Sequence, residues 1–198
     1  MIKNSYSILG YIQLVIYVLR TKLISARARI IRFPIEIRGK RFIDFGYNLT
    51  TGKGCRLEAF STNNNINKKI IFHKNVQIND YVHISAMERV TIGDNVLMAS
   101  HIYISDNSHG FYKGSKQTSP SIPPIKRDYY IAPVSIGKNV WIGEGVVIMP
   151  GVEIGEGSII GANSTVTKSI PNYSIAVGQP AKIIKQYNFT KKAWIPVQ

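Results

Sequence analysis

Residues 136–171 read IGKNVW IGEGVV IMPGVE IGEGSI IGANST VTKSIP, which is six consecutive units of six residues. Each unit begins with Ile or Val, and most carry a small residue in second place and Val or Ser in fifth place. A period of six is neither that of an α-helix nor the simple alternation of an ordinary strand. The pattern predicts one branched aliphatic side chain pointing inward at every sixth position.

Three such units make one turn of a parallel β-helix, and the next turn stacks on it. Residues 18 positions apart should therefore lie over one another. The predicted pairs are Ile136 with Ile154, Ile142 with Ile160, and Ile148 with Val166. Most units have glycine in second place, where the missing Cβ lets the chain turn a crowded corner.

The same pattern occurs earlier, at 72–83 (FHKNVQ INDYVH) and 92–103 (IGDNVL MASHIY), and more faintly from Phe45 in FGYNLT. Strands of a β-sandwich are spaced at about 8–12 residues with period-two alternation, which excludes that fold here. We therefore predict an all-β solenoid, a single domain over residues 42–198. Its open sheet edges require caps, and we expect the C-terminal cap at about 172–198.

One long interruption separates the two series of repeats. Residues 110–133, GFYKGSKQTSPSIPPIKRDYYIAP, are rich in proline and polar side chains, so we predict a protruding loop. A loop of this length inside a compact domain usually serves function.

A basic N-terminal segment, residues 1–41, precedes the repeats. Within it, residues 8–23 place apolar side chains three and four positions apart, which predicts an amphipathic helix. Gln13 and Arg20 break the apolar run too early for a membrane span, and the residues that follow do not resemble a signal-peptide cleavage site. We expect this helix to lie on the anionic inner face of the cytoplasmic membrane, to cap the solenoid, or to do both.

The net charge of +14 is concentrated at the two ends of the chain. Residues 1–41 contribute +8, and residues 157–198 contain five lysines and no acid. This distribution predicts two separate anionic partners, and the lack of base-stacking motifs argues against nucleic acid. The single cysteine, Cys55, is expected to be a buried, inert thiol in a protein of the reducing cytoplasm.

These features resemble the hexapeptide-repeat acyltransferases, and among them the O-antigen, galactoside and maltose O-acetyltransferases. The resemblance extends over about 42–187 and is carried by NVQINDYVHISA, ISDNSHG, APVSIGKNVWIGEGVVIMPGV and IGANSTVTKSIPNYSIAVGQPAKIIKQY. It implies a left-handed β-helix and a homotrimer that binds acetyl-CoA between neighbouring helices. It also implies acetyl transfer to a hydroxyl of a bacterial surface polysaccharide or of a lipid-linked sugar.

The resemblance assigns the general base to His109, where the repeats give way to the loop. An imidazole titrates near neutral pH and so suits removal of a proton from an attacking hydroxyl. Asp106 either orients this ring or is a solvated loop carboxylate. The acceptor sugar is expected to contact Asn79, Tyr81, His83 and Tyr103.

Small residues at two corners would let the pantetheine arm lie against the backbone, where an amide can stabilise the oxyanion. C-terminal lysines would face the phosphates of acetyl-CoA. Glu144 stands where some relatives carry a small hydroxyl residue. The positions that the resemblance implies for acetyl-CoA are Trp141, Gly143, Glu144, Gly161, Ala162, Thr167, Lys168, Lys182 and Lys185.

Other functions stay open, because a fold does not determine chemistry. The enzymatic alternatives are N-acetylation of a nucleotide amino sugar and O-acetylation of serine. A γ-type carbonic anhydrase would need three converging histidines, and the four histidines here lack that spacing, so no metal site is predicted. The non-enzymatic alternative is a basic, membrane-binding solenoid.

Overall fold

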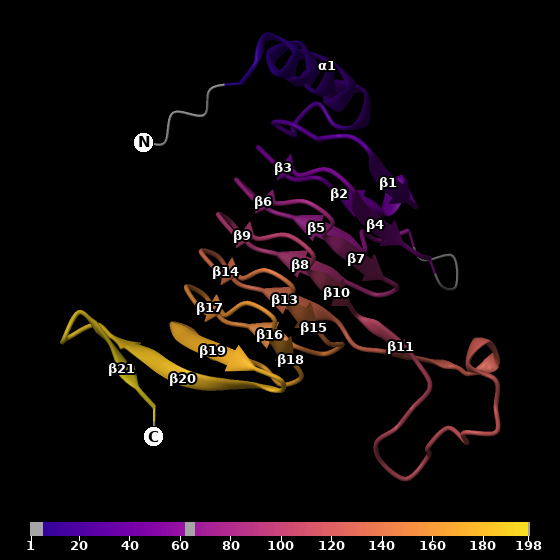
Figure 1. The fold of residues 1–198 in the computed structure, drawn as a ribbon. Coiled ribbons are helices and arrows are strands. Elements are labelled where there is room, and N and C mark those ends of the chain that lie inside the picture. Colours follow the sequence, from indigo (N-terminus) through magenta and orange to yellow (C-terminus); the bar gives the residue numbers. More distant parts are fainter. Residues whose placement is uncertain (1–5, 62–65, 198) are drawn as a thin grey trace.

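The computed structural model describes residues 6–61 and 66–197. The chain winds into a parallel β-helix with three faces, named here A, B and C (Figure 1). Each turn runs through the C face, then the A face, then the B face, so the corners follow in the order C/A, A/B and B/C.

The strands of each face are parallel neighbours from successive turns. The A face holds β3 (Thr50–Thr51), β6 (Gln77–Ile78), β9 (Leu97–Met98), β14 (Trp141–Ile142), β17 (Ile159–Ile160) and β19 (Ser174–Gly178). The B face holds β1 (Ile35–Arg38), β4 (Cys55–Ala59), β7 (His83–Ala86), β10 (Tyr103–Ser105), β15 (Val147–Ile148) and β18 (Thr165–Val166). The C face holds β2 (Ile43–Asp44), β5 (Ile70–Phe72), β8 (Val90–Ile92), β13 (Val134–Ile136) and β16 (Glu153–Ile154).

The stacking registers confirm the predicted period of 18 residues. Ile136 pairs with Ile154, Ile142 with Ile160, and Ile148 with Val166. These side chains are at most 2% exposed and form part of one continuous aliphatic core. The core holds because each inward side chain packs on those of the turns before and after it.

The corners are tight, and they depend on the fourth residue of each unit. Asn139 and Gly145 have φ of 59° and 67°, a left-handed conformation that Asn and Gly tolerate best. The role of this Asn/Gly position was not predicted, although Asn or Gly recurs there in the repeats. Glycine in second place acts as predicted: a Cβ on Gly143 would lie 2.6 Å from the backbone N of Ala162 on the next turn.

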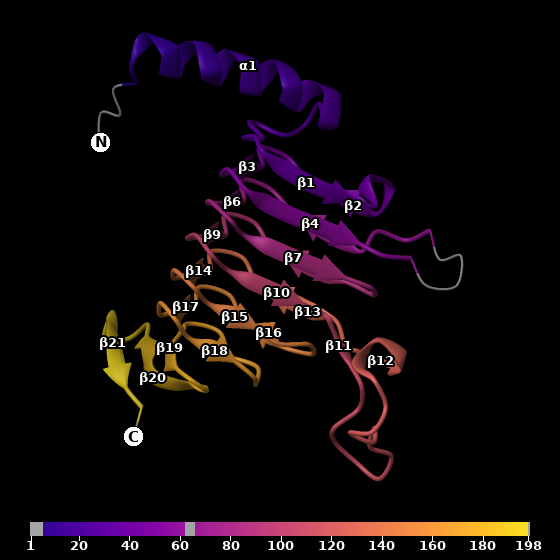
Figure 2. The same ribbon diagram turned by 45° about the vertical axis from the view of Figure 1, so that its right-hand side comes forward.

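Helix α1 (Ile8–Ile24) lies across the N-terminal end of the solenoid (Figure 2). Its buried side chains are Tyr17 and Thr21. The Thr21 hydroxyl accepts a hydrogen bond from the Ile31 amide at 2.7 Å and donates one to the Tyr17 carbonyl at 2.6 Å, while the Tyr17 hydroxyl donates to the Phe33 carbonyl at 3.0 Å. The helix therefore docks through these hydrogen bonds, together with the Tyr17 ring on Phe33 and Ile24 against the core.

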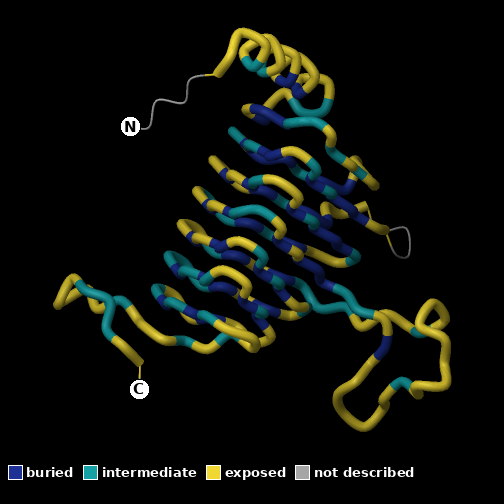
Figure 3. The backbone as a smooth tube through the Cα atoms, in the orientation of Figure 1, coloured by how far each residue is buried: buried dark blue, intermediate teal, exposed yellow. Residues whose placement is uncertain are grey.

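Most apolar residues of α1 are exposed, and Figure 3 colours most of the helix accordingly. Ile8 is 81% exposed, Leu19 64% and Leu23 82%. Exposed side chains also include Leu9, Tyr11, Ile12, Val15, Ile16 and Val18. No helix of the described residues is long and apolar enough to cross a membrane.

The long loop and the C-terminal strands depart from the regular coil. Between β10 and β13 the chain leaves the B/C corner as a long loop, which begins and ends with the antiparallel pair β11 (Asn107–His109) and β12 (Tyr129–Ile131). At the C-terminal end, β20 (Ala181–Asn188) and β21 (Ala193–Pro196) extend the A face as antiparallel strands. Short 3₁₀ helices lie at Lys40–Phe42 and Pro124–Lys126.

Candidate active site

His109 lies at the end of β11, where the long loop leaves the solenoid. Its backbone pairs with Tyr129 of β12, and the two rings pack with their centroids 4.7 Å apart. The imidazole is exposed, and the main-chain oxygen of His109 accepts a hydrogen bond from the Tyr112 hydroxyl. A two-stranded ribbon thus holds the ring at the B/C corner while leaving it accessible.

Asp106 anchors this ribbon, which corrects both expectations for the residue. It is 0% exposed and so is not a solvated loop carboxylate, and its contacts lie with the backbone rather than with the imidazole. One oxygen accepts from the amides of Glu88 and Arg89, both at 2.7 Å, and the other accepts from the Met87 amide at 2.9 Å and the Asn107 side chain at 3.0 Å. The carboxylate ties the root of the loop to the preceding turn.

A cavity of about 360 Å³ lies on the other side of β11 from His109. Alternate residues of a strand face opposite ways, and Ser108 and Gly110 line the cavity on either side of the histidine in sequence. Thr167, one of the predicted acetyl-CoA contacts, also lines it. The other lining residues are Phe111, Tyr112, Lys113, Tyr130, Met149 and Pro150. These six were not predicted individually, because most of them come from a loop without a repeat.

The A/B corner carries a second group of predicted site residues. Asn79 follows β6, and its side-chain oxygen accepts from Gln77 at 3.2 Å. Tyr81 has φ of 57° and stacks on His101, with ring centroids 5.0 Å apart and planes at 13°. The side chains present an amide and an exposed aromatic surface on one corner.

Further along the same corner, Gly143 and Ala162 follow the A-face strands β14 and β17. The two turns approach closely here, since a Cβ on Gly143 would lie 2.6 Å from the backbone N of Ala162. Gly161 is half-buried beside them. The Glu144 carboxylate accepts from the Ser100 amide at 3.0 Å, so it also caps the corner of the preceding turn.

Trp141 and two of the three lysines predicted for acetyl-CoA lie next to this corner on the A face. The strand registers run from Trp141 to Ile159, then to Ile175, and then to Lys185. Lys182 lies on the same strand, β20, and both lysines are exposed. By contrast, Thr167 and Lys168 follow β18 at the B/C corner.

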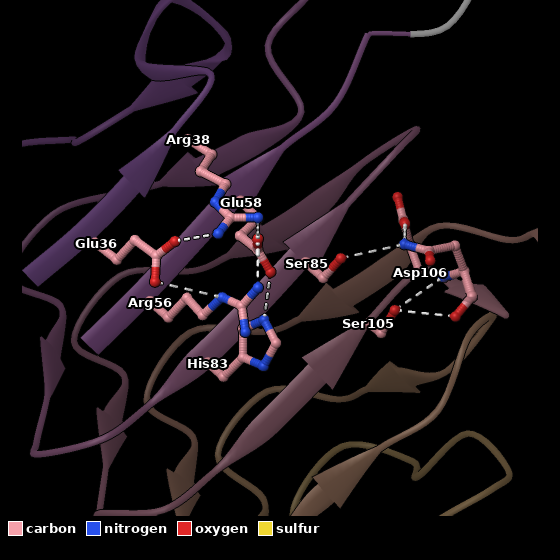
Figure 4. Close-up of polar contacts among 9 residues, drawn as sticks. Glu36, Arg38, Arg56, Glu58, His83, Ser85, Ser105 and Asp106 are labelled. Carbon is pink, nitrogen blue, oxygen red and sulfur yellow. Dashed lines mark hydrogen bonds and ion pairs between the residues drawn. The ribbon is translucent and has the colours of Figure 1, made fainter. Parts of the chain in front are cut away.

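His83 and Tyr103 lie between the two corners, in adjacent strands of the B face, with ring centroids 5.1 Å apart. The His83 Nε2 lies 2.8 Å from Glu58, which is 4% exposed and also receives a 2.8 Å hydrogen bond from Arg56 and a 3.1 Å contact from Arg38 (Figure 4). Burial opposes ionisation of Glu58, but the hydrogen bonds from His83 and Arg56 outweigh it, so the pKa of Glu58 is lowered.

The predicted residues therefore form two groups at opposite ends of the B-face strands. Asn79 and Tyr81 directly precede β7, whereas His109 leaves the corner after β10. The B face, with His83 and Tyr103, separates the groups within one chain. Among the described residues, no group of three or more His, Cys, Asp or Glu could hold a metal ion.

The fold and these residues define a hexapeptide-repeat transferase. A family model described as "Bacterial transferase hexapeptide (six repeats)" matches residues 133–168. WbbJ of Escherichia coli (strain K12), named for an O-acetyl transferase role in lipopolysaccharide biosynthesis, is 47% identical over 190 residues, which is 96% of this chain and 94% of WbbJ. The chain belongs to the hexapeptide-repeat acetyltransferases, and this family membership supports the left-handed coil.

Two further relatives are similar over most of the solenoid. Galactoside O-acetyltransferase of Escherichia coli (strain K12) is 39% identical over 161 residues, covering 78% of this chain and 72% of the relative. The hexapeptide-repeat acetyltransferase VCA0836 of Vibrio cholerae O1 biovar eltor, solved in complex with acetyl coenzyme A, has a TM-score of 0.56 at 27% identity and covers 72% of this chain and 70% of that one.

Proposed function

We propose that the chain transfers an acetyl group from acetyl-CoA to a hydroxyl of a sugar in a bacterial surface polysaccharide. The observation that carries the proposal is the exposed imidazole of His109 on a ribbon whose other side shares a cavity with Thr167. The similarity to WbbJ and to galactoside O-acetyltransferase favours a sugar hydroxyl over serine.

In this mechanism the imidazole of His109 removes the proton from the sugar hydroxyl as that oxygen attacks the thioester carbonyl. The tetrahedral oxyanion accepts a hydrogen bond from a backbone amide at the A/B corner, near Ala162. The carbon–sulfur bond then breaks, and the imidazolium returns its proton to the leaving thiolate. Acetyl-CoA and the sugar hydroxyl become CoA and the acetyl ester, without an acyl-enzyme.

We infer further that the active site lies between copies of the chain in a homotrimer. The B face separates His109 from Asn79 and Ala162, so one chain presents two half-sites. A closed ring of copies, each offering its A/B corner to the B/C corner of the next, would unite the two halves. Acetyl-CoA then lies between neighbours, with Lys168 on one side and Lys182 and Lys185 on the other.

Mixed assembly tests this arrangement directly. His109→Ala and Asn79→Ala should each abolish most turnover alone. When the two variants are refolded together in equal amounts, random assembly should restore about a quarter of the wild-type sites. Half of the junctions then join unlike copies, and only one of the two possible orders pairs an intact histidine with an intact asparagine. If the mixture stays as inactive as its components, the site belongs to one chain. Full activity of His109→Ala would refute the proposed base.

The acceptor is tested by thiol release from acetyl-CoA with sugar, nucleotide amino sugar and serine acceptors in parallel. The amide of Asn79 and the stacked pair Tyr81–His101 suit a polyhydroxylated ring. We expect turnover with the sugars. Faster turnover with serine or with a nucleotide amino sugar would refute the sugar hydroxyl as the acceptor.

We propose, finally, that the protein attaches peripherally to the inner face of the cytoplasmic membrane through α1. The broad apolar side of the helix stays exposed, because Tyr17 and Thr21, the residues buried by docking, lie on the opposite side. An interfacial helix with flanking basic residues binds anionic lipid surfaces. This attachment would bring the enzyme close to lipid-linked sugar acceptors.

A further inference from the structure

A basic hollow lies where the C-terminal end of α1 meets the first turn of the solenoid. It encloses about 540 Å³ and is lined by residues from three separate segments. The lining residues are Ile24, Ser25, Arg27, Lys40, Arg41, Ile43, Asp44, Phe45 and Lys68. Its apolar lining consists of Ile24, Ile43 and Phe45.

The charge of this hollow is strongly positive. Four cationic side chains line it, and its one acid, Asp44, is already paired with Arg27 at 2.7 Å. The Nζ of Lys40 donates to the Leu23 carbonyl at 3.2 Å, and the Nζ of Lys68 donates to the Arg41 carbonyl at 2.7 Å. An ammonium group has three donors, so both lysines keep donors for an anion while the backbone holds them in place.

The position of the hollow relative to α1 selects the kind of anion. Leu23, whose carbonyl holds Lys40, is 82% exposed, and Leu19 one turn earlier is 64% exposed. An anion bound here therefore lies beside a strip of exposed aliphatic side chains. A phospholipid can bind both features at once, because its phosphate binds the cations and its acyl chains cover the aliphatic side chains. A free phosphate would leave the aliphatic side chains in water.

We propose that this hollow binds the phosphate of an anionic phospholipid headgroup and so fixes how the helix lies on the membrane. The inference rests on the proposed peripheral attachment. Membrane binding through this hollow would place the membrane at the N-terminal end of the stack, with the coil axis directed away from it (Figure 2). Asn79 would then lie one turn, His109 two turns and Gly143 three turns further from the membrane than the hollow.

The test compares vesicle binding by the full chain and two charge-matched variants. Lys40→Gln/Arg41→Gln removes two cations from the hollow, and Lys191→Gln/Lys192→Gln removes two cations near the C-terminal end of the A face. The vesicles are phosphatidylcholine alone or phosphatidylcholine with phosphatidylglycerol. We expect the first variant to lose roughly thirtyfold in affinity for anionic vesicles, which is about 2 kcal/mol at 1.4 kcal/mol per tenfold, and the second to lose less than about threefold.

A third variant, Leu19→Glu/Leu23→Glu, separates this inference from the attachment on which it rests. If it abolishes vesicle binding while Lys40→Gln/Arg41→Gln does not, the helix binds membranes and the headgroup site is wrong. If the helix variant binds as well as the wild type, peripheral attachment itself fails. Thermal melting must show that each variant is folded, and single Arg41→Gln provides a second variant that keeps the Lys40 contact to the helix.

Two further results would overturn the headgroup site. One is equal weakening by the two charge-matched variants, which would indicate diffuse attraction. The other is inorganic phosphate competing with anionic vesicles at low millimolar concentration, which would make the hollow a site for soluble anions. Turnover with a water-soluble sugar acceptor should be the same for all these variants, so loss of that activity would concern the acetyl-transfer proposal instead.

Discussion

Replacing Asp106 by Asn should destabilise the protein and impair catalysis together, although residue 106 need not touch substrate. Both carboxylate oxygens of Asp106 are occupied, one by the amides of Glu88 and Arg89 and the other by the Met87 amide and the Asn107 side chain. An asparagine can offer its single oxygen to only one of these donor pairs. The other pair then faces an NH₂ group.

The size of the effect follows from these contacts. A donor left without a partner in a buried site costs about 1–3 kcal/mol, and the bonds that remain lose the charge of the carboxylate. Because Asp106→Asn leaves two such donors without an acceptor, we expect the free energy of unfolding to fall by about 3 kcal/mol. The loop root should also shift, and a displacement of about 1 Å at the base can lower kcat by tenfold or more.

Urea unfolding at fixed protein concentration, read together with kcat and KM, measures both effects. The matched control is Asp94→Asn, because Asp94 accepts a 2.8 Å hydrogen bond from the Lys74 amide at an exposed corner. We expect the control to lose less than about 1 kcal/mol and to keep its kcat. A loss below about 0.5 kcal/mol for Asp106→Asn would refute the assignment of this carboxylate as the loop anchor.

Three further predictions concern the coil itself. Gly143→Ala should cost about 2–3 kcal/mol in urea unfolding, because its Cβ would lie 2.6 Å from the Ala162 nitrogen. Burial raises the pKa of Cys55 from 9.0 to about 11, so alkylation at pH 8 should be about 100-fold slower than in the urea-unfolded chain. The lowered pKa of Glu58 adds stability above its ordinary value of 4.5, and this stability is lost as pH falls through the folded pKa. Glu58→Gln should therefore destabilise the protein at pH 7, and the difference from wild type should shrink in acid.

Each of these predictions has a contrary outcome. Unchanged stability of Gly143→Ala would mean that the two turns are further apart than the coil requires. Equal alkylation rates in the folded and unfolded chain would place the Cys55 thiol at the surface. A stability difference for Glu58→Gln that stays constant from pH 7 into acid would show that its ionisation is not coupled to folding.

The solenoid itself could be predicted from the sequence, because its determinant is local and repetitive. One aliphatic side chain at every sixth position specifies the period, and the pairs such as Ile142 with Ile160 follow by counting. The loop could be located for the same reason, since it is where the repeat stops. The family resemblance then singled out His109, which the structure holds on an exposed ribbon at the start of that loop.

The polar anchors and the orientation of α1 emerged only in the tertiary structure. Asp106 meets amides 17 to 19 residues away, and His83 meets Glu58 at a separation of 25. The helix wheel shows an apolar stripe but not which side docks, and docking is decided by what Thr21 and Tyr17 find at Ile31 and Phe33. A repeat determines what lies inside because every turn offers the same neighbour. Hydrogen-bond partners instead depend on how unlike segments from different turns are brought together. The six-residue repeat does not predict these contacts.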